Sequence, residues 1–117
     1  MSCYTFLKAR IENKESVIFI AQMDEKAVGF VQLYPLFSST RLQAMWLLND
    51  LYVSPEARQK GVASALIIKA QHHSRLTQAA GLLLETEKTN GPGNTLYPKM
   101  NFTLDQDHNY YFWETEA

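Results

Sequence analysis

The chain has 117 residues, of which 46% are hydrophobic and 20% charged, and its formal net charge is −1 at neutral pH. This composition predicts one folded domain spanning residues 1–117, and it argues against a disordered chain and against nucleic-acid binding by charge. No apolar run is long enough for a membrane span or a signal peptide, and Cys3 is the only cysteine, so we expect a cytoplasmic protein without an internal disulfide or membrane contact.

The first part of the chain predicts a short helix followed by two strands. Tyr4–Asn13 has apolar residues at helical spacing, which favours a short helix. Ser16–Met23 and Ala27–Tyr34 are rich in β-branched and aromatic residues and predict two strands joined by a turn at Asp24–Lys26. Gly29 is a candidate position for a β-bulge in the second of them.

A third strand and a long helix are expected next. After a loop at Pro35–Leu42, Ala44–Val53 is apolar enough to be a central strand buried on both faces. Residues 61–80 have the periodicity of an amphipathic helix, and Gly81 is placed to end it. The apolar stripe of this helix consists of Val62, Leu66, Ala70 and His73.

The rest of the chain predicts three short elements. Leu82–Thr86 reads as a strand, and the order strand–helix–strand makes it parallel to the strand before the helix. Leu96–Met100 has a helical pattern that Pro98 interrupts. Asn109–Glu114 predicts a terminal aromatic strand packed on both faces.

The most informative segment joins the third strand to the long helix and reads Arg58-Gln59-Lys60-Gly61-Val62-Ala63. The first turn of a helix has N–H groups without partners, and its dipole favours an anion. Gly61 would let the backbone approach that anion closely. The segment is neither a P-loop nor a dinucleotide fingerprint, because it lacks Gly-Lys-Ser/Thr and spaced glycines. It predicts a pyrophosphate site at the carboxyl end of a strand.

The flanking residues add a family resemblance. Residues Asp50–Leu66 resemble the acetyl-coenzyme A motif of the GNAT superfamily of N-acetyltransferases, in which Arg or Gln is followed, after two intervening residues, by Gly-x-Gly/Ala. Residues Asn90–Phe102 resemble the second signature of that family, and the resemblance extends over about Ser16–Glu114. The stretch Asp50–Val53 is most similar to small-amine and polyamine acetyltransferases. The positions that match the second signature are Asn90, Gly93, Leu96, Tyr97 and Phe102.

The resemblance implies an α/β fold with a mixed, mostly antiparallel sheet, a central splayed parallel strand pair and flanking helices. It also implies an N-acetyltransferase that moves an acetyl group from acetyl-coenzyme A to a primary amine by direct attack and without a metal. The acceptor would be a small polyamine-like, amino-acid-like or aminoglycoside-like molecule. The alternative is a non-catalytic or degenerate coenzyme A-binding module that has kept the pyrophosphate loop.

The family pattern assigns roles to individual residues. The splayed strand would bind the pantetheine arm and offer an N–H group to the oxyanion. Backbone amides of the loop would bind the pyrophosphate, and Tyr97 would protonate the leaving thiolate because a phenol holds its proton at neutral pH. The residues expected to bind the cofactor are Leu51, Tyr52, Val53, Arg58, Gln59, Lys60, Gly61, Val62, Ala63, Ser64 and Asn90.

The chain departs from the family pattern close to the expected chemistry. Asn49 stands where polyamine-type enzymes often have Glu, so Asp50, Glu85 or a bound water remains as the base. Pro98 follows Tyr97 directly, and proline disfavours a helical conformation at the preceding residue, which would displace Tyr97.

Two further departures lie outside this region. Asn101 replaces the usual Gly before Phe102, which is tolerable because asparagine accepts left-handed conformations. About 15 residues precede the strand at Ser16, so the family's first strand and much of the helical pair that covers the acceptor site are expected to be missing. The unpaired edge and uncovered surface would favour a homodimer, with Tyr110–Trp113 as part of the contact.

Overall fold

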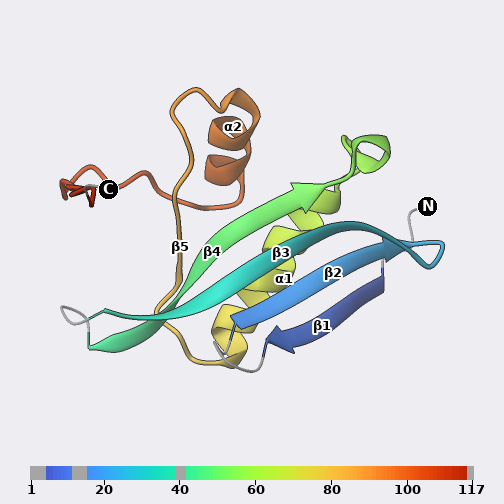
Figure 1. Ribbon diagram of the computed structural model, residues 1–117, viewed down its shortest axis with the longest axis horizontal. Helices are drawn as coiled ribbons and strands as arrows, with labels where there is room; N and C mark the ends of the chain where they lie inside the picture. Colours follow the sequence, from blue (N-terminus) through green and yellow to red (C-terminus); the bar gives the residue numbers. More distant parts are fainter. Residues whose placement is uncertain (1–4, 12–15, 39–41, 116–117) are drawn as a thin grey trace.

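The computed structural model describes residues 5–11, 16–38 and 42–115. Within them, five strands form one mixed sheet in the order β1-β2-β3-β4-β5, with α1 crossing between β4 and β5 (Figure 1). The expected mostly antiparallel sheet with one parallel pair is confirmed. The elements are β1 (Thr5–Ile11), β2 (Ser16–Met23), β3 (Lys26–Ser38), β4 (Gln43–Val53), the short 3-10 helix η1 (Pro55–Ala57), α1 (Val62–Leu76), β5 (Leu82–Leu84) and α2 (Gly91–Lys99).

The expectation of a helix at Tyr4–Asn13 is wrong, because residues 5–11 form strand β1. This strand pairs antiparallel with β2, from Thr5 opposite Gln22 to Ile11 opposite Ser16. A helical spacing of apolar residues over so few positions is weak evidence, and the exposed edge of β2 supplies hydrogen-bond partners that override it. A first strand is therefore present, although only four residues, 12–15, separate it from β2.

The β2–β3–β4 meander contains the three expected strands, and β3 is longer than expected. Val28 is the extra residue of a bulge, because Ala21 pairs with Gly29 and Gln22 with Ala27, so the bulge lies one residue from the expected position. β3 continues to Ser38, through residues expected in a loop. The continuation can contain a proline at position 35 because β2 pairs only as far as residue 33, which leaves one side of β3 without a ladder there.

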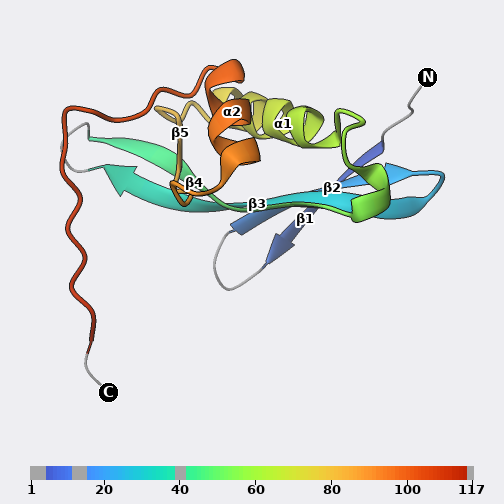
Figure 2. The ribbon, with the colours of Figure 1, turned by 90° about the horizontal axis from the view of Figure 1, so that it is seen from above.

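The core lies between the sheet and α1. The expected helical stripe is confirmed, since Val62, Leu66, Ala70 and His73 are all buried. Gly29 lies under the start of α1, where an added Cβ would be 3.3 Å from a methyl carbon of Val62. Figure 2 shows both helices on one side of the sheet, so within the described residues the opposite face has no helix over it.

Two expectations about the later part of the chain are wrong. α1 ends at Leu76 with Thr77 as its C-cap, so Gly81 lies beyond the helix, at the approach to β5. The Thr77 hydroxyl donates to the His73 carbonyl at 3.0 Å and closes the last turn. Residues 109–114 form no strand, because no neighbouring strand lies beside them to complete a ladder. In the described part of the chain, neither helix has the length and apolarity of a membrane span.

Candidate cofactor and acetyl-transfer site

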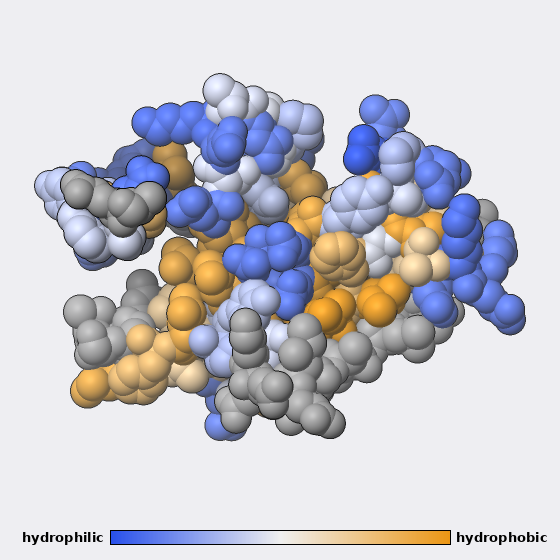
Figure 3. All heavy atoms as spheres, viewed as in Figure 1, coloured by the Kyte–Doolittle hydropathy of each residue, from blue (hydrophilic) through white to orange (hydrophobic). Residues whose placement is uncertain are grey.

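β4 and β5 are parallel for only three residue pairs and then separate. The pairing ends at Leu48 and Leu84, while β4 continues through Asn49–Val53, where β3 is its single strand partner among the described residues. The strands diverge toward their carboxyl ends in Figure 1, and Figure 3 shows an open notch in the surface between α2 and the loop that precedes α1. The expected splay is therefore present, with backbone groups of β4 facing the gap.

A β-bulge lies at the point where the strands separate. Gln32 pairs with Asp50, but the next residue, Leu33, pairs with Leu48, which leaves Asn49 as an extra residue on β4. Bulges bend a strand and increase its local twist. The bulge therefore turns the last residues of β4 away from β5.

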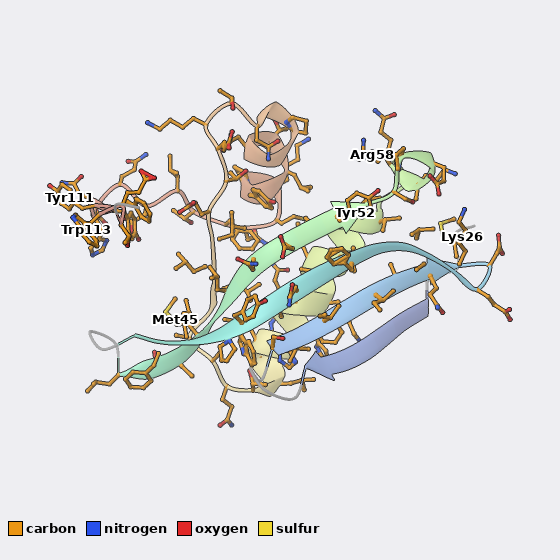
Figure 4. The ribbon with its side chains drawn as sticks, in the orientation of Figure 1. Lys26, Met45, Tyr52, Arg58, Tyr111 and Trp113 are labelled. Atoms are coloured by element: carbon orange, nitrogen blue, oxygen red, sulfur yellow. The ribbon has the colours of Figure 1, made fainter. Side chains whose placement is uncertain are left out.

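The loop after β4 is fixed to the end of that strand. The Nε atom of Arg58 donates to the carbonyl oxygen of Val53 at 3.1 Å, and the Ser54 N–H donates to Val28 at 2.8 Å. The one acidic group of this loop, Glu56, lies 3.4 Å from the Nζ of Lys26. Figure 4 shows Arg58 on the loop and Tyr52 on the strand that leads to it.

The loop ends in the amino terminus of α1 without a side-chain cap. Gly61 is the N-cap residue at φ 81°, and Gln59 has φ 63°, so two residues of the loop are left-handed. No side chain caps the helix, and Ala65 makes the first backbone bond at the helix start, to the Gly61 carbonyl at 3.0 Å. An added Cβ at Gly61 would meet nothing within 4 Å, so the space above the first turn is open. This end of α1 can receive an anion.

On the other side of the splay, the amino terminus of α2 depends on a contact between an amide and a glycine. The Oδ1 of Asn90 accepts the N–H of Gly93 at 3.1 Å, and its Nδ2 donates to the Thr86 hydroxyl at 2.8 Å. A Cβ at Gly93 would lie 2.4 Å from that Nδ2 and 3.2 Å from a ring carbon of Tyr97. The Asn90 side chain that caps α2 lies against position 93 and leaves no room for a side chain there, which explains the Asn-x-x-Gly spacing.

Tyr97 remains helical, so the expectation that Pro98 displaces it is wrong. The proline falls in the last turn of α2, where it removes only one N–H from the ladder. The ring of Tyr97 packs edge-on against Phe102, with centroids 5.8 Å apart, and burial raises the pKa of its phenol. Asn101 has φ 70°, which confirms that asparagine serves as a left-handed residue between them.

The sheet face opposite α1 carries a polar strip between aromatic rings; we call it the open face (Phe30, Gln32, Tyr34, Asp50 and Tyr52). Cross-strand pairing sets Phe30 beside Tyr52, with ring centroids 6.0 Å apart, and Gln32 beside Asp50. The Nε2 of Gln32 donates to the Tyr34 hydroxyl at 2.9 Å. These residues alternate with the buried residues under α1, and Figure 3 shows this side of the sheet with apolar patches between polar ones.

The strand–loop–helix arrangement matches known proteins along most of its length. The family model of the acetyltransferase (GNAT) domain matches residues 14–104. An uncharacterized N-acetyltransferase of Bacillus subtilis, YhfO, is 42% identical over 106 residues, which cover 91% of this chain and 71% of that protein. The chain belongs to the GNAT acetyltransferase family. A crystal structure of a probable acetyltransferase agrees with it at a TM-score of 0.81 and 38% identity, over 88% of this chain and 70% of that chain.

Another relative is matched over a smaller share of its own length. A probable acetyltransferase of Haemophilus influenzae is 43% identical over 81 residues, which cover 68% of this chain but 56% of that protein. The chain therefore spans between about half and three quarters of the relatives it matches. The fold class and the enzyme class, N-acetyltransferase, are confirmed at the level of the family.

The structure brings most of the predicted site residues to the two sides of the splay. The strand residues, the loop and the start of α1 form one side, and Asn90 and Tyr97 on α2 form the other. Val62 is buried with 1% exposure, so it can serve a ligand only through its backbone. Both polar atoms of the Asn90 side chain already have partners, and its expected contact with the cofactor arm stays a prediction.

Sequence reasoning did not find the bulge at Asn49 or the partners of the second signature. Asn49 and Asp50 are two successive polar residues in an apolar strand, and that break in the pattern was a usable signal. The Nδ2 of Asn94 donates to the carbonyls of Glu87 and Asn90 at 3.0 and 2.8 Å, which fixes the turn before α2. Nothing in the spacing along the sequence indicates that contact.

Proposed function

We propose that this GNAT domain transfers the acetyl group of acetyl-coenzyme A to a primary amine of a small cationic molecule. The observation that carries the proposal is the separation of β4 from β5 after Leu48, on a strand that leads through the loop of residues 54–61 into the uncapped amino terminus of α1. One continuous stretch of backbone thereby offers strand hydrogen bonds to an extended arm and N–H groups to a pyrophosphate.

The residues of the splay and of the loop before α1 fit acetyl-coenzyme A as co-substrate. The unpaired side of Leu51–Val53 would hold the pantetheine arm as a neighbouring strand would, and the backbone from Gln59 to Ser64 would hold the pyrophosphate. Gly61 supports this placement, because a glycine adopts the left-handed conformation at this position without strain and the space above it is open. When bound, the thioester supplies an activated acetyl group, whose developing oxyanion a β4 N–H would stabilise.

The open face would present the amine. Asp50 is exposed beside Gln32, between the tilted ring pair Phe30–Tyr52 and Tyr34. A carboxylate attracts an ammonium group, and aromatic faces attract cations. Such a strip selects positively charged amines over neutral ones. Among more distant relatives is an aminoglycoside N(6')-acetyltransferase of Klebsiella aerogenes, 27% identical over 84% of this chain, and its name accords with a polycationic acceptor.

The protons move through this chain's own groups or water. The attacking amine must be neutral, and Asp50 or a water beside it accepts the proton that the ammonium loses. The amine nitrogen would form its bond to the acetyl carbon as the carbon–sulfur bond breaks, and Tyr97 Oη would give its proton to the departing thiolate. The proton that the nitrogen loses on becoming an amide would return through water to the Tyr97 phenolate, so that coenzyme A leaves as the thiol. Burial raises the pKa of Tyr97, so the phenol is protonated at neutral pH and ready to act as the acid.

A thiol-release assay tests the proposal. We expect free coenzyme A to form from acetyl-coenzyme A in the presence of polyamines, aminoglycosides or amino-acid amides, and the acetylated amine to be found by mass spectrometry. The control is the same panel with N-methylated tertiary amines, which cannot form a stable amide. Binding of coenzyme A without turnover on any primary amine would instead establish a coenzyme A-binding module, and loss of both would overturn the site itself.

A further inference from the structure

The side chain of Gln71 connects α1 to the carboxyl end of α2. Gln71 is half-buried on α1, and its Nε2 donates to the carbonyl oxygen of Met100 at 2.7 Å. Met100 is the C-cap residue of α2, where the last carbonyl groups of a helix have no partner within the helix itself. Figure 2 shows the two helices on the same side of the sheet. The bond therefore fastens one helix to the other.

Met100 and Tyr97 move together, because backbone hydrogen bonds close the turn that contains them. The carbonyl oxygen of Tyr97 accepts the N–H groups of Met100 and Phe102 at 3.0 and 3.1 Å. The ring of Tyr97 packs edge-on against that of Phe102. Asn101, at φ 70°, takes the left-handed conformation with which such helix ends close. A shift of the Met100 carbonyl would therefore carry the phenol of Tyr97 with it.

α2 needs an external contact of this kind, because its own sequence supports a helix poorly. It has nine residues, with glycines at positions 91 and 93 and a proline at position 98. Helices shorter than about 12 residues are marginal on their own, and glycine and proline lower the helix propensity further. Of these nine residues, all of which the structure describes, Gly93 alone is buried. A hollow of about 390 Å³ adjoins Gln71, Asn101 and Phe102, so close packing does not fill the space at this end of α2.

The same helix, α1, also begins at the loop assigned to the pyrophosphate. Its first residue, Val62, follows Gly61 of that loop, and Gln71 lies about two and a half turns further along. At a rise of about 1.5 Å per residue, the two positions are about 14 Å apart on one rigid element. The cofactor would therefore be placed by the start of α1, and the phenol by the middle of α1 through Gln71. Misplacing a catalytic group by about 1 Å can cost about 10²-fold in rate.

We propose that Gln71 is a positioning residue, which holds the Met100 carbonyl and thereby sets the place of the Tyr97 phenol relative to the thioester. This inference rests on the proposed function, in which Tyr97 Oη protonates the departing thiolate. Gln71 contacts neither the cofactor nor the amine in this role and acts through Tyr97. Its loss therefore lowers kcat and leaves the affinity for the cofactor unchanged. A residue that served the fold alone would lower the free energy of unfolding without any dependence on Tyr97.

A double-mutant cycle with Tyr97 tests this role. Gln71→Met keeps nearly the same volume but cannot donate, and we expect kcat to fall about 10–10²-fold on any amine that the wild type acetylates. KM for acetyl-coenzyme A and the calorimetric affinity for coenzyme A should not change. In a Tyr97→Phe background the same substitution should lower kcat by less than about twofold, because no phenol is left to position. An equal loss in both backgrounds, or no loss in Gln71→Met, would overturn the proposal.

Two further variants show whether the hydrogen bond itself is responsible. Gln71→Lys keeps an N–H donor that can reach the Met100 carbonyl, so it should recover most of the kcat that Gln71→Met loses. Gln43→Met is the matched control, because it makes the same chemical change at an exposed residue at the start of β4, at the other end of that strand from the splay. We expect wild-type kcat in Gln43→Met. A loss there as large as in Gln71→Met would contradict the proposal.

Amide hydrogen exchange separates failure of this inference from failure of the proposed function. The N–H of Phe102 should exchange about tenfold or more faster in Gln71→Met, while that of Ala70 within α1 keeps its protection. Faster exchange at Phe102 in a protein whose wild type acetylates no amine would refute the proposed function, and the positioning role would fall with it. An active wild type, with neither kcat nor the exchange at Phe102 changed in Gln71→Met, would overturn this inference alone.

Discussion

The carbonyl oxygen of Tyr52 requires a glycine at position 29, because a Cβ on Gly29 would lie 2.7 Å from that oxygen. Methyl carbons of Val62 and Leu66 would each lie at 3.3 Å from the same Cβ. The glycine therefore sets how closely the start of α1 approaches the part of β4 that faces the splay. A side chain there would push apart the two backbone segments assigned to the cofactor.

Gly29→Ala is expected to lower the free energy of unfolding by about 1–3 kcal/mol, as overpacking of a filled site does. The measurement is urea unfolding followed by circular dichroism. The matched control is Gly81→Ala, since a Cβ at Gly81 meets nothing within 4 Å and Gly81 does not have a positive φ. Equal free energies of unfolding for the two variants would show that α1 can move away from the sheet to accommodate the methyl group without a loss of stability.

Removing the cap of α2 should destabilise the domain modestly. Asn90→Ala loses both the bond from the Gly93 N–H and the bond to Thr86, and loss of an N-cap typically costs about 1 kcal/mol. Asn90→Asp keeps an oxygen for the Gly93 N–H, so thermal unfolding should show a smaller loss. If both variants unfold like the wild type while affinity for coenzyme A falls, Asn90 serves the cofactor and not the helix.

Tyr97→Phe should lower kcat by about 10²–10⁴-fold and leave the affinity for coenzyme A nearly unchanged, as expected for loss of a general acid. The raised pKa predicts that activity persists to alkaline pH and is lost as pH rises through the folded-state pKa, above the usual value of 10. The free energy of unfolding changes with pH in the same direction. The contribution of the Tyr97 phenol to it is complete below pH 10 and is lost as pH rises through the raised pKa. Wild-type turnover in Tyr97→Phe would contradict the role as general acid and would leave Tyr97 only its packing contact with Phe102.

The open face should govern the acceptor and not the cofactor. Asp50→Asn removes the carboxylate but keeps a hydrogen-bonding group of the same size, so KM for a polyamine should rise about tenfold or more, equivalent to ~1.4 kcal/mol. A fall in kcat as well would identify Asp50 and not a water as the acceptor of the ammonium proton. Affinity for coenzyme A should stay the same, which calorimetry measures. A KM that is unchanged across mono-, di- and polyamines would mean that the amine approaches from another side.

The sequence predicts an element well where its own periodicity is long or its motif is specific. The pattern predicts α1 because Val62, Leu66 and Ala70 recur over several turns, and the splay is implied by the resemblance of the motif after β4 to the GNAT signature. β1 was predicted as a helix because seven residues carry too little periodicity, and the pairing with β2 decides the outcome. The pattern at Asn109–Glu114 is that of a strand, but a strand also needs a neighbour.

The site was predictable in its residues more than in its geometry. Gly61 and Tyr97 follow from local motifs, and the structure places them on opposite sides of the splay. The bulge at Asn49 depends on register with β3, and the Gly93 requirement depends on how Asn90 folds over it. Both are relations between backbone segments, which residue spacing alone does not encode.

Calorimetric titration of coenzyme A into wild type and Gly61→Glu tests the central claim, that the loop before α1 holds the pyrophosphate. We expect an affinity at least about tenfold weaker in the variant, since a carboxylate would occupy the open space above the first turn of the helix. Affinity for pantetheine, which carries neither phosphate of the pyrophosphate, should change little. A folded Gly61→Glu that binds coenzyme A as tightly as the wild type would contradict the assignment of this loop.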